Sequence, residues 1–428
     1  MPTFLVQTLG CKLNQLESEA ITDAFSNKGY SYNPKDESPS LIIINTCTVT
    51  SKADQKARRV IRKALRDYPC ARVIVTGCYA QLNKDDIIKL ETDGKGRLSV
   101  IGKDKIISHD KNDLFQFNPK KFSQHTRSFL KIQDGCDKNC TYCKIRLARG
   151  KSVSLDKDEV LSRLRILEKN HAEAVLTGVN ISQYKDDGTD NIFNLSALLE
   201  YLLSGTERIA IRLSSLAPES IDERLVKVLS HPRIRPHFHL SVQSCSNIIL
   251  DKMARAYNSQ TVKRAAGLLR GAKNAPFLAC DIIAGFPGET EIEFNETFSI
   301  CKELDFAWIH VFPFSKRQGT PAFSFKNTVT ESEVTKRVNL LTNLAKQGRE
   351  DYVRRWLGKD VDALVEKDKL KVKDQQQNIC FGTSENYLKV KIQYEGVNPP
   401  LPGSVLRCRL TNIGDFKNCD VTAVILRK

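Results

Sequence analysis

Alternating strand and helix patterns over residues 127–356 constrain the fold of this chain most strongly. Segments with helical periodicity separate six short apolar segments of strand length: Arg127–Gln133, Ala174–Gly178, Arg208–Ser214, His237–Gln243, Phe277–Ala284 and Ala307–Pro313. Such alternation favours parallel strands joined by helices, as in a barrel. We therefore predict an α/β chain with a partial (β/α)6 barrel and a long helix over Glu331–Trp356. Its functional site should lie at the carboxyl ends of the strands.

The segments on either side of this barrel have different patterns. Near the N-terminus, Phe4–Thr8, Leu41–Asn45 and Arg72–Thr76 are typical of buried parallel strands, and helical patterns lie between them, which favours a small doubly wound α/β domain. The C-terminal segment has short alternating runs split by Gly and Pro, which favours a small antiparallel β-barrel of the kind that often binds RNA. We predict domains at 1–105, 127–356 and 357–428, with a polar linker at 106–126.

Three cysteines, Cys136, Cys140 and Cys143, follow the first predicted barrel strand at spacings of four and three. A cubane [4Fe–4S] cluster needs four ligands, so three thiolates leave one iron open to a substrate or cofactor. Zinc is the competing metal, but a structural zinc site needs four ligands, and no nearby histidine or cysteine completes one. A distant fourth ligand remains an alternative.

A second set of cysteines, Cys11, Cys47 and Cys78, follows the three predicted strands of the first domain. Ligands collect beyond the carboxyl ends of parallel strands, so we expect these thiols to converge and to hold a second open cluster. A lone cysteine is more often a small buried residue. That interpretation is retained for the others, which are Cys70, Cys245, Cys280, Cys301, Cys380, Cys408 and Cys419.

The chain of 428 residues has a net charge of +16, which fits a polyanion such as tRNA, although solubility alone is the simpler explanation. One predicted helix, residues 51–66, concentrates cations on a single face. A face of one sign has no internal salt bridges, so we expect it to bind RNA, with a solvated basic face as the alternative. The predicted contacts are Lys52, Lys56, Arg59, Lys63 and Arg66.

The N-terminal segment lacks the basic start and apolar run of a signal peptide, and no apolar stretch is long enough to span a bilayer. We therefore expect a cytoplasmic protein without a membrane partner. The cytosol keeps thiols reduced, so the thirteen cysteines do not indicate a disulfide framework.

Taken together, these motifs resemble the radical S-adenosylmethionine methylthiotransferases over essentially the whole chain. The Cys136–Cys143 motif matches the family's cluster motif, and Ala148-Arg149-Gly150 matches a triplet that follows it. The chain is most similar to the branch that modifies N6-threonylcarbamoyladenosine in tRNA. The segments that carry this similarity are Leu9–Asn14, Asn45–Thr50, Lys52–Lys56, His310–Ser315 and Gly319–Pro321. Two departures are Arg146, in a segment where the family has proline, and Cys245, where glycine is usual.

The resemblance implies a tRNA-modifying enzyme that methylthiolates C2 of this adenosine at position 37, in the anticodon loop. It implies two [4Fe–4S] clusters, two molecules of S-adenosylmethionine per turnover, a sulfur donor, an electron donor such as flavodoxin or ferredoxin, and a C-terminal TRAM domain that grips the tRNA. No general base stands out, in agreement with a radical route, and no catalytic residue is assigned beyond the cluster ligands. The residues expected near S-adenosylmethionine are Tyr142, Gly178, Asn180, Ser214, Gln243, Arg255 and Gly285.

Two alternatives remain open from the sequence. One is methylthiolation of isopentenyladenosine at the same tRNA position. The other is a non-catalytic RNA-binding protein whose clusters act structurally or as redox sensors, although it leaves unexplained why both sites have three cysteines.

Overall fold

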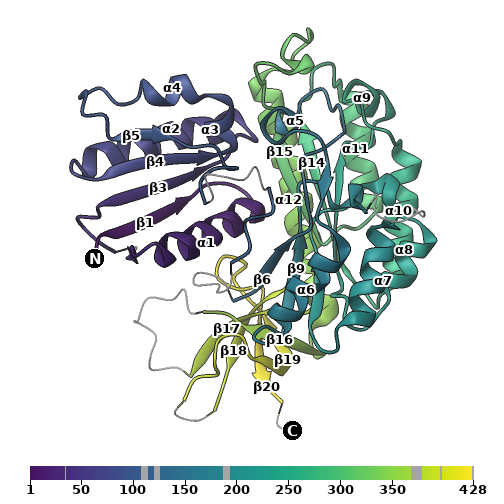
Figure 1. Ribbon diagram of the computed structural model, residues 1–428. Coiled ribbons are helices and arrows are strands. Elements are labelled where there is room, and N and C mark those ends of the chain that lie inside the picture. The colour runs from purple at the N-terminus through teal and green to yellow at the C-terminus, as the bar shows by residue number, and fades with distance from the viewer. Residues whose placement is uncertain are drawn as a thin grey trace.

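Parallel strands form the central domain of the computed structural model, which describes residues 1–33, 35–107, 114–119, 126–186, 193–367, 378–395 and 398–426 (Figure 1). One sheet has the order β12-β9-β6, and a second has the order β13-β14-β15. Isolated parallel bridges, Ile211 to Ile234 and Leu216 to Leu240, connect the two sheets. The predicted partial barrel is therefore confirmed. Its strands are β6 (Ser128–Lys131), β9 (Glu173–Thr177), β12 (Ala210–Leu213), β13 (His237–Gln243), β14 (Phe277–Ala284) and β15 (Trp308–Pro313).

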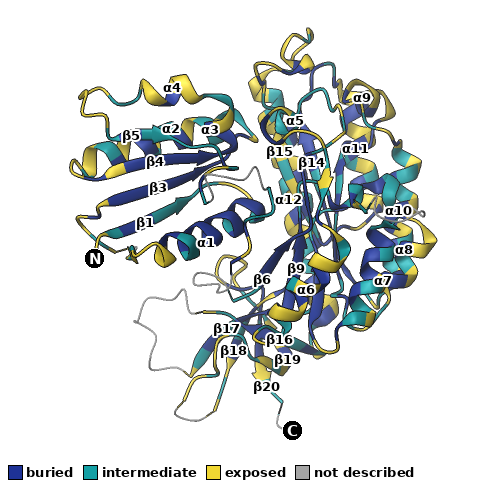
Figure 2. Ribbon diagram, in the orientation of Figure 1, coloured by how far each residue is buried: buried dark blue, intermediate teal, exposed yellow. Residues whose placement is uncertain are grey.

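Helices cover the outer face of these strands, and the strands themselves are largely buried (Figure 2). Side chains that accept hydrogen bonds from the first free backbone N–H groups fix several helix starts, among them Asp156, Asn194, Asp222 and Asn258. The helices are α5 (Ile145–Arg149), α6 (Lys157–Glu168), α7 (Leu195–Gly205), α8 (Glu223–Leu229), α9 (Asn247–Lys252), α10 (Ser259–Ala272), α11 (Glu291–Glu303) and α12 (Glu331–Trp356). Helix α12 has the bounds that the sequence predicted.

Short elements complete the central domain. β7 (Gln133–Asp134) pairs with β8 (Val153–Ser154), and β10 (Lys185–Asp186) pairs with β11 (Phe193–Asn194). The first of these hairpins encloses the loop that carries the cysteine triplet.

A parallel sheet of order β2-β1-β3-β4-β5 forms the first domain, as the doubly wound prediction requires. Every residue of β3 is buried, because helices cover both faces of the sheet. The strands are β1 (Thr3–Thr8), β2 (Ser31–Tyr32), β3 (Leu41–Thr46), β4 (Arg72–Gly77) and β5 (Leu98–Val100). The helices are α1 (Lys12–Asn27), α2 (Ser51–Asp67), α3 (Cys78–Leu82) and α4 (Lys84–Ile88).

The C-terminal domain is a closed barrel of order β16-β17-β18-β20-β19. Its strands are β16 (Asp360–Val365), β17 (Ile379–Ser384), β18 (Lys389–Gln393), β19 (Val405–Ile413) and β20 (Val421–Ile425). Four pairs are antiparallel as predicted, but β18 and β20 run parallel. A ring of five strands cannot alternate direction throughout, so at least one parallel pair is required. Tyr352 and Trp356 of α12 pack into this barrel's core.

Much of the predicted linker, including residues 108–113 and 120–125, lies outside the described residues. Its described parts are packed: Ile106 and Phe117 are buried against Ile43 and Ile74 of the first domain. Among the helices that the structure describes, none has both the length and the hydropathy to cross a bilayer.

Candidate active site between the first two domains

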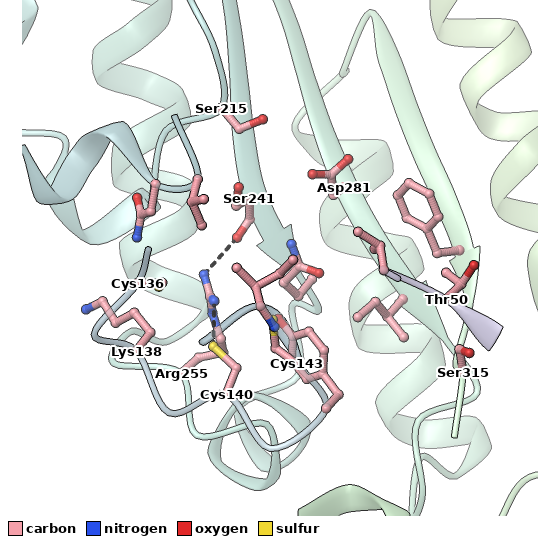
Figure 3. A pocket seen from close by; sticks show the side chains of 18 of the residues that line it. Thr50, Cys136, Lys138, Cys140, Cys143, Ser215, Ser241, Arg255, Asp281 and Ser315 are labelled. Atoms are coloured by element: carbon pink, nitrogen blue, oxygen red, sulfur yellow. Dashed lines mark hydrogen bonds between the residues drawn. The ribbon is translucent and has the colours of Figure 1, made fainter. Parts of the chain in front are cut away.

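The triplet Cys136, Cys140 and Cys143 lines a cavity of about 300 Å³ at the carboxyl ends of the central strands (Figure 3). The backbone holds this loop in place. The Cys136 N–H donates to the Gly150 carbonyl at 3.1 Å, and the Thr141 N–H donates to the Met253 carbonyl at 3.1 Å. The three thiols therefore face the position where a parallel barrel places its chemistry.

Arg255 is a cation in direct contact with this triplet. Its Nη1 donates to Sγ of Cys140 at 3.1 Å, and its Nη2 donates to the Ser241 carbonyl at 3.1 Å. Burial, together with the neighbouring thiols of Cys140 and Cys136, raises the pKa of Cys143 to about 11. A thiolate here thus needs a strong cationic partner, and metal ligation supplies one. Three thiols on one short loop fit the thiolate ligation of an iron–sulfur cluster.

Among the residues expected near S-adenosylmethionine, Tyr142, Asn180, Gln243 and Arg255 line the cavity. Gln243 ends β13 with a left-handed backbone, φ 66°, just after an irregularity in the pairing with β14. That conformation is rare for a residue other than glycine and is common at functional sites.

Three other expected residues, Gly178, Ser214 and Gly285, do not line it. A Cβ on Gly178 would lie 2.8 Å from the Gln133 carbonyl oxygen, so this glycine permits a close approach within the protein. Gly285 has φ 78° in a turn, where its N–H donates to Glu289 Oε2 at 2.7 Å. The neighbour of Ser214, Ser215, lines the cavity instead, because successive side chains of an extended chain point to opposite faces.

The second set, Cys11, Cys47 and Cys78, follows three adjacent strands, β1, β3 and β4. A Cβ on Gly10 would lie 2.6 Å from the Cys47 Cβ, so only glycine lets the β1 loop approach Cys47 this closely. Burial, together with the nearby thiols of Cys11 and Cys78, raises the pKa of Cys47 to about 11. This set also fits thiolate ligation of a cluster.

A buried network connects this second set to the central domain. Arg149, the last residue of α5, donates from Nε to Sγ of Cys78 at 3.1 Å and from Nη1 to Glu17 Oε1 at 2.8 Å and Asp134 Oδ1 at 3.1 Å. Lys131 Nζ lies 2.5 Å from Asp134 Oδ2. Arg149 was not predicted as a site residue, and the only signal for it was its place in the Ala148–Gly150 triplet.

The first domain also forms part of the cavity wall. Val49 and Thr50 line the cavity, and Thr50 follows Cys47 by three residues. Three residues of extended chain span at most about 11 Å, so Cys47 lies close to the wall. Arg317 holds this loop, because its Nη2 donates to the Thr48 carbonyl at 2.8 Å and lies 2.9 Å from Asp54 Oδ2.

Within the described parts of the chain, no three Cys, His, Asp or Glu side chains converge as ligands of one metal ion would. A cubane cluster binds each thiolate through a different iron atom, so its ligands stand further apart than those of a single ion.

The basic face of α2 is exposed. The buried residues of this helix are Ala57, Ile61 and Ala64, and Thr50 caps its N-terminus by accepting the Ala53 N–H. The five predicted RNA contacts all lie on the solvent side: Lys52, Lys56, Arg59, Lys63 and Arg66. Their role in RNA binding stays a prediction.

The remaining cysteines are buried as expected, with one exception. Cys70 is exposed, because it lies in the turn between α2 and β4, outside the domain core. The buried ones are Cys245, Cys280, Cys301, Cys380, Cys408 and Cys419.

Comparisons with known proteins agree with this architecture. Residues 3–95 match the model of uncharacterized protein family UPF0004, and residues 130–301 match that of the radical SAM superfamily. The structure of the radical S-adenosylmethionine methyltransferase TsrM from Kitasatospora setae aligns with a TM-score of 0.52 at 14% identity, covering 72% of each chain. This likeness shows the fold alone.

Curated relatives match along almost the whole chain. The threonylcarbamoyladenosine tRNA methylthiotransferase MtaB of Treponema pallidum is 37% identical over 96% of this chain and 98% of its own length. The protein of the same name from Bacillus subtilis is 33% identical over 97% of this chain and 95% of its own length. A tRNA-2-methylthio-N(6)-dimethylallyladenosine synthase from Bacillus velezensis is 29% identical over 85% of this chain and 76% of its own. The chain therefore belongs to the radical SAM methylthiotransferases and is an enzyme of the MtaB type.

Proposed function

We propose that this enzyme methylthiolates C2 of N6-threonylcarbamoyladenosine at position 37 of tRNA, with two [4Fe–4S] clusters and two molecules of S-adenosylmethionine per turnover. One observation carries the proposal: two sets of three cysteines meet at one domain boundary. One set lines the cavity, and the other includes Cys47, three residues from the cavity wall.

The two sets have different roles in this proposal. Cys136, Cys140 and Cys143 would hold the cluster that serves S-adenosylmethionine, and Cys11, Cys47 and Cys78 would hold the cluster that supplies the sulfur. When bound, these groups supply the radical and the methylthio group. An aromatic C2–H is not acidic enough for ordinary base catalysis, which favours a radical route.

The chain's own residues hold and shield these groups. Arg255 donates to Cys140 and orients the cysteine loop, and Tyr142 packs edge-on against Phe286 at the cavity wall. Phe312 and Ile283 contribute an apolar lining that excludes water from the reacting atoms.

The MtaB name of the more similar relatives supports the threonylcarbamoyl substrate. The relative named for dimethylallyladenosine is less identical and covers less of the chain, so isopentenyladenosine is the second candidate. The exposed basic face of α2 and the C-terminal barrel are the proposed tRNA contacts. The proposal also requires a sulfur donor, a one-electron donor such as flavodoxin or ferredoxin, and a cytoplasmic location.

Mass spectrometry of tRNA nucleosides from cells that lack this gene tests the proposal. We expect the 2-methylthio derivative of threonylcarbamoyladenosine to disappear and to return when the intact gene is supplied, but not a gene with Cys136→Ala. Loss of the isopentenyl analogue instead would assign the enzyme to the sister reaction.

A further inference from the structure

A second cavity of about 670 Å³ lies between the central strands, α12 and the C-terminal barrel. Trp308 and His310 of β15 line it, and Phe312 of the same strand lines the first cavity. Two residues of a strand span about 7 Å, so the two cavities are neighbours along β15.

Polar side chains occupy the position between the two cavities. His239 Nε2 lies 3.0 Å from Asp281 Oδ1, and His239 Nδ1 lies 3.3 Å from the Ser215 hydroxyl. The His239 and His310 rings are stacked, with centroids 5.1 Å apart. Asp281 and Ser215 line the first cavity, where Figure 3 shows them deeper along the strands than the cysteine loop, whereas His310 lines the second.

The hydrogen-bonding roles of this group follow from its contacts. The Trp308 indole N–H donates to His310 Nδ1 at 3.2 Å, so Nε2 carries the hydrogen of a neutral ring. Burial, together with His239, lowers the pKa of His310 to about 4, which keeps the ring neutral at physiological pH. His310 thus offers a donor, and the Asp281 carboxylate offers acceptors.

We propose that Asp281 and His310, positioned by His239, bind the polar N6 substituent of the target adenosine and select it over adenosines without that substituent. This inference rests on the proposed function. The threonylcarbamoyl group has ureido N–H and hydroxyl donors for Asp281, and carbonyl and carboxylate acceptors for His310. The second cavity also has exposed lysines, Lys346, Lys389 and Lys417, that suit a carboxylate.

An apolar substituent would offer no hydrogen bond to His310 or to Asp281, which is partly buried. A site built to hydrogen-bond a substrate rejects an analogue that lacks the matching groups far more strongly than an apolar pocket rejects an extra methylene. The same side chains thus both hold the correct nucleoside and exclude an isopentenyl group.

The test uses reconstituted enzyme and two tRNAs that differ only in whether A37 carries the threonylcarbamoyl group. For Asp281→Asn and His310→Phe, we expect the preference for the modified tRNA to fall about tenfold or more, both in the Kd ratio from fluorescence anisotropy and in the kcat/KM ratio. Affinity for the unmodified tRNA, which lacks the group that these residues would contact, should stay at the wild-type level. His231→Asn, a histidine outside both cavities, is the matched control.

Three experimental outcomes would distinguish failure of this inference from failure of the proposed function. Variants that keep the wild-type preference would overturn the inference while the proposed function stands. Loss of 5′-deoxyadenosine formation without tRNA in Asp281→Asn would overturn it too, because Asp281 would then serve S-adenosylmethionine. Failure of the wild-type enzyme to methylthiolate the modified tRNA would refute the proposed function itself. His310 is exposed, so its variant tests the inference even where Asp281→Asn impairs folding.

Discussion

Arg149 of the central domain donates a hydrogen bond from Nε to Sγ of Cys78 in the first domain, at 3.1 Å. Its helix, α5, begins two residues after Cys143. A five-residue helix is about 7.5 Å long, so one short segment connects the two cysteine sets. The same guanidinium also pairs with Glu17 and Asp134. The relative position of the two sets is thus fixed by a charged network and not by apolar packing alone.

Removal of this guanidinium should destabilise the protein strongly. Arg149→Met leaves the buried Glu17 and Asp134 with fewer counter-charges, and breaking such a pair costs about 3–5 kcal/mol. We expect a clearly lower denaturant midpoint for unfolding. The control, Arg224→Met, removes an exposed partner of Glu200 and should leave the midpoint unchanged. Equal effects of the two variants would show that the network is not a determinant of stability.

Glu173 should make the stability pH-dependent in acid. Burial alone would raise its pKa, but Arg212 and Arg235 outweigh burial and lower the pKa from 4.5 to about 2. The pKa of Glu173 is lower in the folded protein than in the unfolded chain. The ionised carboxylate therefore adds its full contribution to the free energy of unfolding above about pH 4.5, and this contribution is lost as the pH falls towards 2. It amounts to ~3 kcal/mol at neutral pH.

Denaturant unfolding between pH 6 and pH 2 measures this dependence. Glu173→Gln should be less stable than wild type at neutral pH and should show a flatter decline in acid. Parallel declines for the two proteins would contradict the assignment.

Arg317 should control docking of the first domain. Arg317→Ala removes the buried contacts to Thr48 and Asp54. We expect methylthio transfer to fall, whereas 5′-deoxyadenosine formation without tRNA persists, because the Cys136–Cys143 loop stays intact. Hydrogen exchange should rise in the loop after β3. The adjacent Lys316→Ala keeps the carbonyl that accepts from Ser51 and should behave as wild type. Equal loss of both activities would indicate general damage instead.

The α2 face should contribute to tRNA binding through phosphate contacts. Charge reversal of Lys56, Arg59 and Lys63 should weaken binding and flatten the slope of log affinity against log salt, because fewer counterions are released. The control reverses the same number of exposed lysines elsewhere in the first domain: Lys84, Lys89 and Lys95. Unchanged affinity and slope in the α2 variant would remove this helix from the interface.

Local patterns predicted much of this structure. The bounds of β13, β14 and α12 follow from hydrophobic periodicity, and both cysteine sets follow from their places after strands. Parallel strands bring their carboxyl ends together, so residues that directly follow a predicted strand can be recognised from the local sequence and also lie at the site.

The residues that the sequence did not reveal act through distant partners. Arg149 contacts Cys78 across 71 positions and Arg317 contacts Thr48 across 269, so no local periodicity encodes either pair. We expected Ser214 at the cavity, but its neighbour Ser215 lines it. An error of one residue at a strand end is enough to change the face to which a side chain points.

The most direct test of the two-cluster account is anaerobic single turnover with reconstituted enzyme, dithionite, S-adenosylmethionine and tRNA that carries threonylcarbamoyladenosine at position 37. Wild type should form both 5′-deoxyadenosine and the 2-methylthio nucleoside. The variant with Cys11, Cys47 and Cys78 all replaced by alanine should form 5′-deoxyadenosine alone, and the variant with Cys136, Cys140 and Cys143 replaced should form neither. Formation of the 2-methylthio nucleoside by the first of these variants would contradict the account.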